Sequence, residues 1–563
     1  MINGHSATNG SSGDKVELNL SDVLETIANA YPDRVALVHG PAAYTFSGLA
    51  DRAARLGRYL ADRGLGCFAE RSELANHQTG QHMLAQYLRN GTHYVEGLFG
   101  AYRARVAPFN VNYLYQAEEL SYLLRNAGPA AIQYHAEFAP RLAEVLPSLT
   151  PPPLLLQVDD GSGHPLLPGA VDYESALQSV PASVPSVPSP DDLYVIYTGG
   201  TTGMPKGVLW RQADVAVATL GLQNRRAGRE WRSLDDLGEA VRRKPSRVLP
   251  CAPLMHGASQ WAALGALCEG NAVVFPDDAR TFNAAQVLSA VERHQVTALT
   301  IVGDAFGYPL VEELERGGRD MSSLRTLVSG GAALHPRVRR RLQELIPHLR
   351  VVENIGSSES GVQGSRHSHS SEPAASEAFF PDANTVIVAG DFSGMLRPGD
   401  AGSHVTGWLA RRGRIPLGYL GDEGKTAQTF PIIDGIRVTI PGDRVRLLPD
   451  GRVELLGRDS LTINTGGEKV YVEEVESVLK DHPDIIDAVV CGRQSVRWGS
   501  EVVAVVHGHP GIEIDELKEF CRDRLARYKV PKAFRVVNKI RRGPAGKPDY
   551  RWAAKQFEQD LTD

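Results

Sequence analysis

Short apolar segments alternate with amphipathic segments through the first part of the chain, from Val35 to Leu156. The segment VALVHG is followed by a stretch that begins near Ser47, in which apolar residues recur at helical spacing. Residues 93–103 and 116–126 show the same helical pattern, while VAPFNV and AAIQYH have the composition of strands. Alternating strands and helices are typical of parallel sheets flanked by helices, so the pattern predicts an α/β fold.

The alternation returns in a second block at residues 281–352. Between the two blocks, residues 151–190 are rich in Pro, Ser and Gly, which predicts an irregular surface connection. After Phe380, strand-like pieces separated by Gly and Pro turns continue as far as Leu456. These pieces predict a small β-barrel-like subdomain.

Beyond Arg458 the pattern changes to that of a compact βα domain, with IDAVVCG, EVVAVVHG and AFRVVN as its strands. The apolar stripes of its two predicted helices are Val472, Val475 and Leu479 in one and Leu517, Phe520 and Leu525 in the other. A chain of 563 residues exceeds the usual size of one core. We therefore expect a large N-terminal domain at residues 1–457, with a flexible tail at residues 1–15, and a small mobile C-terminal domain at residues 458–563.

The composition of the chain disfavours some classes of protein and favours others. A net charge of −6 with interspersed signs argues against a nucleic-acid partner. No apolar run approaches the ~18 residues of a membrane span, and residues 1–15 lack a signal-peptide core. The five cysteines form no CxxC or Cys/His cluster, so the sequence favours a cytoplasmic protein with reduced thiols. A homodimer is compatible with these properties.

A predicted strand at residues 193–197 leads into a glycine-rich loop that precedes Lys206. The loop consists of Thr198, Gly199, Gly200, Thr201, Thr202 and Gly203. Glycines allow backbone N–H groups to approach an anion, and the hydroxyl and ammonium groups add further donors for phosphate oxygens. It is not a Walker A loop, because Pro205 precedes the lysine and Gly207 follows it. An ordinary surface turn is the alternative, which the whole string, strand included, disfavours.

The string YVIYTGGTTGMPKGVLW resembles the phosphate loop of the adenylate-forming superfamily, which comprises acyl-CoA synthetases, luciferases and peptide-synthetase adenylation domains. Further motifs similar to those of the superfamily follow in its order. They are Ser329-Gly-Gly-Ala-Ala333, Asn354-Ile-Gly-Ser-Ser-Glu359, Pro441-Gly-Asp443, Gly457-Arg-Asp-Ser460, Thr465-Gly-Gly-Glu-Lys-Val470 and Pro544-Ala-Gly-Lys547. In detail, TGGTTGMPKGVLW, IGSSE and INTGGEKVY most resemble actinobacterial CoA ligases for steroid side-chain acids and other bulky hydrophobic acids.

The resemblance implies a role for each motif, with ATP, Mg2+ and coenzyme A as co-substrates. The loop and Lys206 would hold the ATP phosphates, and Ser358, Glu359 and Lys547 would be catalytic, with Glu359 also binding Mg2+. Gly331, Ala332, Ala333 and Ser357 would border the adenine and ribose, and Asp443 and Arg458 would clamp the ribose. Asp459 would be the hinge between domains, and Gly466, Gly467 and Glu468 would border the CoA tunnel. The chemistry requires such cations, since a carboxylate attacking the α-phosphate brings anion to anion.

The segment Leu254-Met-His-Gly-Ala-Ser259, which would precede the acyl pocket, contains no acidic residue to pair with a substrate ammonium. An unpaired buried ammonium is costly, so an amino acid is disfavoured. His256 and Gly257 would instead be the gate and floor of a pocket for an apolar acid. The expected protein is an acyl-CoA ligase for a polycyclic terpenoid or steroid acid, or for a fatty acid.

One other class of enzyme stays open, and two further classes are disfavoured. An enzyme specialised for one half-reaction, either thioesterification of a preformed adenylate or adenylation for a separate carrier protein, would carry the same motifs. A luciferase-like oxygenase has no specific support in the sequence. GSSESG is not a nucleophile elbow, because Glu359 and Ser360 follow Ser358 where G-x-S-x-G requires a glycine two residues on.

Overall fold

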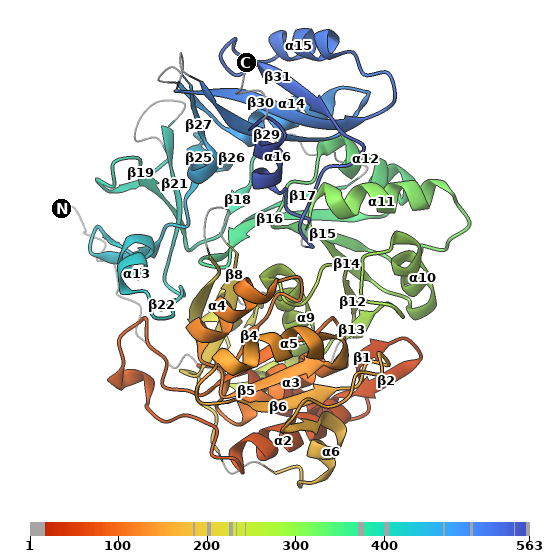
Figure 1. The fold of residues 1–563 in the computed structure, drawn as a ribbon, viewed down its shortest axis with the longest axis vertical. Coiled ribbons are helices and arrows are strands. Elements are labelled where there is room, and N and C mark those ends of the chain that lie inside the picture. Colours follow the sequence, from red (N-terminus) through yellow and green to blue (C-terminus); the bar gives the residue numbers. More distant parts are fainter. Residues whose placement is uncertain are drawn as a thin grey trace, which may run out of the picture.

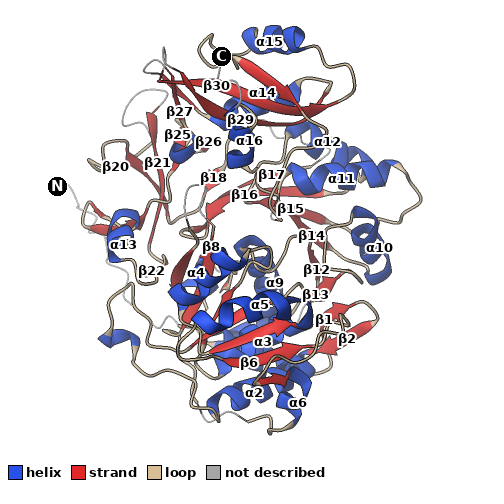
Figure 2. Cartoon of the chain, viewed as in Figure 1, coloured by secondary structure: helices blue, strands red, loops and turns tan. Residues whose placement is uncertain are grey.

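The computed structural model describes residues 17–558, apart from residues 184–185, 200–203, 225–228, 232, 242–243, 370–376, 399–404, 466–467, 496–498 and 545. The predicted α/β fold is confirmed. Helices cover the sheets of a large N-terminal domain, and the small C-terminal domain, blue in Figure 1, lies at one end of the molecule. Figure 2 shows the same arrangement with helices and strands distinguished by colour.

The main sheet of the N-terminal domain has nine strands in the order β18-β17-β16-β15-β14-β12-β13-β1-β2. The strands, in that order, are Phe380–Pro381, Gly361–Ser368, Arg350–Ser357, Thr326–Gly330, Ala298–Ile301, Arg247–Pro250, Ala272–Phe275, Val35–His39 and Ala42–Thr45. The six strands from β16 to β1 are parallel, and the outer strands pair antiparallel with them. The carboxyl ends of parallel strands share one edge, which is where open α/β sheets bind ligands.

A second sheet is wholly parallel, in the order β4-β3-β5-β6-β7. Its strands are Ala107–Asn110, Met83–Tyr87, Ala131–His135, Leu154–Val158 and Ala170–Asp172. The irregular connection predicted for residues 151–190 is therefore wrong in part, because it contains β6, β7 and helix α6 (Tyr173–Gln178). Leu155 and Leu156 of β6 are buried, so core packing outweighs the Pro-rich flanks.

The N-terminal domain contains further β structure, including a two-stranded sheet of β10 (Gln223–Asn224) and β11 (Arg229–Glu230). A three-stranded sheet has the order β22-β9-β8, with strands Gly418–Tyr419, Lys206–Arg211 and Leu193–Thr198. The predicted barrel-like subdomain is confirmed as a nearly closed sheet. Its central strand, β21, pairs with β19 along one edge and with β24 and β25 along the other. Its strands are β19 (Thr385–Ala389), β20 (Met395–Leu396), β21 (Val405–Arg412), β23 (Ile432–Ile433), β24 (Ile436–Thr439), β25 (Asp443–Leu447) and β26 (Val453–Arg458).

The C-terminal domain has hydrophobic clusters of its own, drawn from residues 461–557 alone. Its strands are β27 (Ile463–Thr465), β28 (Glu468–Val470), β29 (Ile485–Ser495), β30 (Gly499–Gly508) and β31 (Ala533–Val536). Its helices are α14 (Val472–Asp481), α15 (Ile514–Arg522) and α16 (Tyr550–Lys555). All three strands predicted from the sequence are confirmed, whereas the boundary between residues 457 and 458 stays a prediction.

The helices of the N-terminal domain agree closely with the apolar periodicity. They are α1 (Leu20–Ala30), α2 (Phe46–Ala61), α3 (Thr92–Arg103), α4 (Ala117–Ala127), α5 (Ala139–Val145), α7 (Gln212–Ala218), α8 (Leu234–Ala240), α9 (Gly257–Cys268), α10 (Ala284–His294), α11 (Asp304–Glu315), α12 (Pro336–Leu345) and α13 (Glu423–Thr429). The helix predicted near Ser47 starts at Phe46 because Thr45 caps it, accepting a hydrogen bond from Gly48 N at 3.1 Å. Within the described part of the chain, no helix combines the length and hydropathy needed to span a bilayer.

Candidate active site

The carboxyl ends of the parallel strands bring three predicted segments to one edge of the main sheet. Gly303 follows β14, the segment Gly331–Ala333 follows β15, and the turn with Glu359 follows β16. Gly303 has φ +59°, and a Cβ there would lie 2.3 Å from the carbonyl oxygen of Ala333. Only glycine allows this approach, which sets the position of the segment predicted to border the adenine.

The predicted phosphate loop is the turn of the β8–β9 hairpin, in which Thr198 pairs with Lys206 across the two strands. Gly199, in the loop, is exposed, and the loop residues Gly200, Thr201, Thr202 and Gly203 lie outside the described residues. Lys206 Nζ lies 2.8 Å from Asp422 Oδ2, and this hydrogen bond is the main reason that the pKa of Asp422 is lowered. Asp422, which was not predicted from the sequence, gives the lysine predicted to bind phosphate a counter-ion.

The turn that carries Glu359 is held by hydrogen bonds from several directions. Ser357 Oγ accepts from the Glu359 N–H at 3.2 Å, and Trp210 Nε1 donates to the Ser358 carbonyl at 3.0 Å. Tyr419 Oη donates to Glu359 Oε1 at 3.0 Å. Trp210 and Tyr419 belong to β9 and β22, so the sheet that carries the phosphate loop also positions the carboxylate. Neither was identified from the sequence.

The predicted ribose clamp and the predicted catalytic lysine lie beside this turn. Asp443 and Arg458 pair across β25 and β26, and Arg458 Nε donates to Asp443 Oδ1 at 3.1 Å. Asp443 is the main cause of the raised pKa of Arg458, to which Glu359 adds. Desolvation and then the charge of Arg458 lower the pKa of Lys547, while Glu359 and Asp443 oppose that shift.

Lys547 has an exposed side chain although protein surrounds it closely enough to lower its pKa. The structure thus brings Lys547, Glu359, Asp443 and Arg458 together from three distant parts of the chain. Their catalytic and ribose-binding roles stay predictions.

Asparagine side chains fix the segment that precedes α9. Asn90 Oδ1 accepts from Leu254 N at 2.6 Å, and Asn110 Nδ2 donates to the Met255 carbonyl at 2.6 Å. Asn110 also donates to the carbonyl of Tyr197 in β8 at 2.9 Å. The segment before His256 is therefore fixed relative to the phosphate loop.

His256 and Gly257 are the residues predicted to be the gate and floor of the acyl pocket, and these roles stay predictions. Burial first, and then Lys547, lowers the pKa of His256 to about 3, so the imidazole is neutral at physiological pH. A Cβ on Gly257 would lie 3.5 Å from Trp261 Cζ2 and 3.6 Å from Ser358 Oγ, so the first residue of α9 lies close to the turn that carries Glu359. Trp261, which was not predicted from the sequence, is a further candidate for lining the predicted acyl pocket.

The hinge and CoA-tunnel predictions fall on the segment that joins the domains. Asp459 Oδ1 accepts from Arg444 Nε at 3.3 Å and lies 3.8 Å from Lys469 Nζ. Glu468 is exposed at the start of β28, and Gly466 and Gly467 lie outside the described residues. The hinge and tunnel roles therefore stay predictions.

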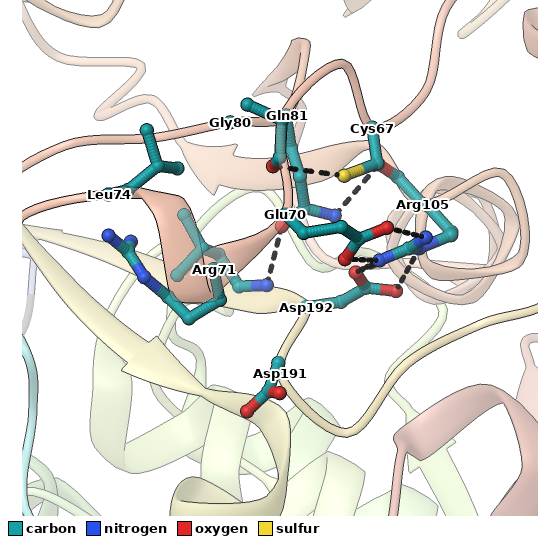
Figure 3. A pocket seen from close by; sticks show the side chains of 11 residues that line it. Cys67, Glu70, Arg71, Leu74, Gly80, Gln81, Arg105, Asp191 and Asp192 are labelled. Atoms are coloured by element: carbon teal, nitrogen blue, oxygen red, sulfur yellow. Dashed lines mark hydrogen bonds and ion pairs between the residues drawn. The ribbon is translucent and has the colours of Figure 1, made fainter.

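A small cavity lies away from these residues, at the beginning of β8 (Figure 3). Its volume is about 10 Å³, which is roughly the space for one water molecule. Arg105 lies at its edge and forms ion pairs with Glu70 at 2.8 Å and Asp192 at 2.9 Å. Figure 3 shows these three side chains converging, so the feature is a structural clamp on the start of β8.

Two protein-family models match this chain. The family described as AMP-binding enzyme matches residues 24–404, and the AMP-binding enzyme C-terminal domain matches residues 474–547. The chain belongs to the AMP-binding enzyme family. This membership confirms the resemblance to the adenylate-forming superfamily.

Several curated members of the AMP-binding enzyme family are similar over almost the whole chain. The medium-chain acyl-CoA ligase Mig of Mycobacterium avium is 48% identical, covering 95% of this chain and 97% of that protein. The medium/long-chain-fatty-acid–CoA/3-oxocholest-4-en-26-oate–CoA ligase of Mycobacterium tuberculosis is 38% identical, covering 97% and 98%. The 3-oxocholest-4-en-26-oate–CoA ligase of Rhodococcus rhodochrous is 36% identical, covering 96% of each chain.

A solved AMP-binding enzyme has the same fold. The anthranilate CoA ligase AuaEII in complex with anthranoyl-AMP superposes with a TM-score of 0.79 at 20% identity, covering 97% of this chain and 98% of that one. At this identity the likeness concerns the fold alone. It includes both the large domain and the small one.

Proposed function

We propose that this protein is an AMP-forming acyl-CoA ligase that activates a hydrophobic carboxylic acid with ATP and transfers the acyl group to CoA. The observation that carries the proposal is the meeting of Lys547 with Glu359, Asp443 and Arg458. A cation from the C-terminal domain lies beside the carboxylates and the guanidinium predicted to face Mg2+, ribose and phosphate. The similarity to CoA ligases over almost the whole chain supports the same activity.

In the first step, a carboxylate oxygen of the acid attacks the α-phosphorus of ATP. A P–O bond to the acid forms, the bond to pyrophosphate breaks, and pyrophosphate leaves. Lys547 would bring its ammonium to the oxygens that gain negative charge, and Lys206 would hold the β- and γ-phosphates. The carboxylate of Asp443 would accept hydrogen bonds from the ribose hydroxyls.

Glu359 is suited to Mg2+, which favours one or two carboxylates together with phosphate oxygens. Tyr419 holds one of its oxygens in place, and the turn fixes the backbone on both sides. A bound Mg2+ would supply Lewis-acid polarisation of the phosphate oxygens. Glu359 would hold that ion.

In the second step, the CoA thiol attacks the acyl carbon of the adenylate. A C–S bond forms, the C–O bond to the phosphate breaks, AMP leaves, and the thiol proton is released to solvent. We expect the C-terminal domain to rotate about Asp459 between the two steps, bringing the strip Gly466–Glu468 to the site. The location in the cytoplasm and the homodimer predicted from the sequence stay predictions.

The substrate class follows from the acyl side of the site and from the relatives. His256 is neutral, and no acidic residue occurs from Leu254 to Ser259, so the segment offers no partner for a charged acyl group. The similar ligases are named for medium- and long-chain fatty acids and for 3-oxocholest-4-en-26-oate. We expect this enzyme to use a medium- or long-chain fatty acid or a steroid side-chain acid.

A pyrophosphate-release assay on a panel of acids, with and without CoA, tests the proposal. Fatty and steroid acids should give CoA-dependent turnover and an acyl-CoA product, while amino acids should give neither. The competing half-reaction enzyme would release one equivalent of pyrophosphate that CoA does not increase, or would form thioester only from supplied acyl-adenylate. Absence of pyrophosphate release with every acid of the panel would overturn the ligase assignment.

A further inference from the structure

A buried ion pair joins the two domains at the first turn of α11. Asp304 begins this helix, and its side chain is 5% exposed. Its Oδ1 accepts from His335 N at 2.7 Å, and its Oδ2 accepts from Lys480 Nζ at 3.2 Å. Lys480 belongs to α14 of the C-terminal domain and is 10% exposed. Both charges are thus largely withdrawn from water. Helices α11 and α14, which carry them, belong to the two different domains (Figure 1).

The turn before Lys547 contacts the same part of α11. Gly546 has φ +73°, a backbone conformation suited to glycine. A Cβ at this position would lie 2.9 Å from Ala305 Cβ and 3.0 Å from the carbonyl oxygen of Val302. The lysine predicted to be catalytic is therefore one residue from a close contact with the N-terminal domain.

Within the C-terminal domain, Asp487 and Arg542 connect Lys480 to the turn at Gly546. Lys480 Nζ lies 3.6 Å from Asp487 Oδ1, and Arg542 donates to both oxygens of Asp487, at 2.7 and 2.9 Å. Arg542 Nη1 also donates to the carbonyl of Gly546 at 2.7 Å. The four charges alternate in sign from Asp304 to Arg542, and we call them the ion row.

The composition of the ion row explains how these charges tolerate burial. Desolvation alone would lower the pKa of Lys480, but Asp304 and Asp487 raise it above its ordinary value. Likewise, Arg542 and Lys480 lower the pKa of Asp487 against its desolvation. Lys480 and Asp487 are thus stabilised in their charged forms by neighbours of opposite sign. Removing one member leaves its neighbours as uncompensated buried charges, which is strongly unfavourable.

We infer that the ion row is a positioning device for Lys547. The Lys480–Asp304 pair holds the C-terminal domain in the orientation that forms the adenylate, and Arg542 transmits that orientation to the turn at Gly546. Lys480 and Arg542 are positioning residues, since they act through the turn. The inference rests on the proposed function, because it assigns adenylate formation to Lys547. The pair must separate when the domain turns for the thiol step, so its loss affects the first half-reaction selectively.

Lys480→Met tests this inference by removing the charge while keeping most of the side-chain volume. Lys529→Met is the matched control, because Lys529 pairs with Glu474 of the same helix at 2.7 Å without reaching the N-terminal domain. Adenylate formation and thioester formation from supplied acyl-adenylate are measured separately, on variants whose folding is verified by circular dichroism.

For Lys480→Met, the kcat of adenylate formation should fall about 10- to 100-fold, the effect of a roughly 1 Å misplacement of a catalytic group. KM for ATP and thioester formation should stay within twofold of wild type. Lys480→Arg should restore part of the lost rate, and Lys529→Met should change neither step. Hydrogen exchange in the first turn of α11 should accelerate in Lys480→Met alone.

Equal loss of both half-reactions, or unchanged adenylate formation, overturns the positioning role. If Lys480→Met does not fold, Asp304→Asn provides the same comparison, because the amide keeps the oxygen that accepts from His335. The two proposals fail differently. A wild-type protein that forms no adenylate refutes the proposed function, whereas an active wild type without a selective loss in the variants refutes only the ion row.

Discussion

At the scale of single residues, Lys547 shares its surroundings with a second cation and two carboxylates. Arg458 disfavours a proton on Lys547, while Glu359 and Asp443 favour it. Such a mixture keeps the site close to electrically balanced before the substrates bind. When the triphosphate and the acid add negative charge, the two cations are already in position, which avoids reorganisation during the reaction.

Lys547→Ala should remove most adenylate formation. Loss of one preorganised donor to a developing charge typically costs about 10²–10³-fold in rate. Thioester formation from supplied acyl-adenylate should remain, because that step expels AMP and needs no new bond to phosphorus. Quenched-flow measurement of each half-reaction checks the prediction, and normal adenylate formation in the variant would contradict the role assigned to Lys547.

Tyr419→Phe should weaken the response to Mg2+. The change removes the hydroxyl that donates to Glu359 Oε1, and hydrogen bonds to charged groups contribute about 1.5–3 kcal/mol. We expect the Mg2+ concentration for half-maximal adenylate formation to rise roughly tenfold, as Glu359 loses its fixed orientation. Titration of the rate with Mg2+ measures this. An unchanged midpoint would show that Tyr419 only packs against the turn.

At the scale of elements, the three-stranded sheet β22-β9-β8 connects the parts of the site. Its hairpin presents Thr198 and Lys206, β9 supplies Trp210, and β22 supplies Tyr419. Asn110 joins this sheet to the segment before His256. A displacement of the hairpin would therefore move together the residues predicted to bind the phosphates, the metal and the acyl group.

Asp459→Pro should separate the two half-reactions. Proline fixes φ and removes the N–H that Asp459 donates to the carbonyl of Gly442 at 3.1 Å. Because the hinge then favours one domain orientation, one half-reaction should fall at least tenfold relative to the other. Parallel assays of pyrophosphate release and thioester formation compare them. Equal retention of both steps would count against rotation about this residue.

Sequence patterns predicted the elements that local chemistry determines. Apolar periodicity predicted many of the helices and strands, and fixed motifs predicted Glu359, Asp443 and Lys547 as site residues, which the folded chain brings near one another. The missed residues depend on contacts between distant segments. In the sequence, Asp422 and Lys480 resemble ordinary charged residues that face solvent. Only the folded chain places them beside Lys206 and Asp304. Strand β6 was not predicted because its Pro-rich flanks indicate an irregular segment. The core contacts that stabilise the strand come from distant parts of the chain.

At the scale of the whole molecule, the two domains meet through charged groups as well as through close backbone contacts. Besides the ion row, Glu473 of α14 lies against the link between the domains. Its Oε1 accepts from Arg458 N at 3.4 Å, and a Cβ on Gly457 would lie 2.2 Å from its Oε2. That Oε2 atom is buried and has no hydrogen-bond partner among the described residues, although the residue as a whole keeps some exposure.

This environment favours the protonated carboxyl. Burial first, and the nearby Asp443 in addition, raise the pKa of Glu473 from 4.5 to about 7. An acid with a raised pKa in the folded protein contributes stability that is fully present below about pH 4.5 and is lost as the pH rises through 7. A shift of this size corresponds to roughly 3 kcal/mol at high pH. The domain orientation described here should therefore weaken as the solution becomes alkaline.

Glu473→Gln keeps the shape of the side chain and cannot ionise. We expect its free energy of unfolding to approach that of the wild type near pH 5 and to exceed it increasingly toward pH 8.5, by roughly 1–3 kcal/mol. Urea unfolding at a series of pH values measures the difference. Glu474→Gln is the matched control, since Glu474 is exposed and pairs with Lys529, and its difference from wild type should not grow with pH in this range. A constant difference between Glu473→Gln and wild type would mean that Glu473 ionises normally, and the alkaline weakening would then require another group.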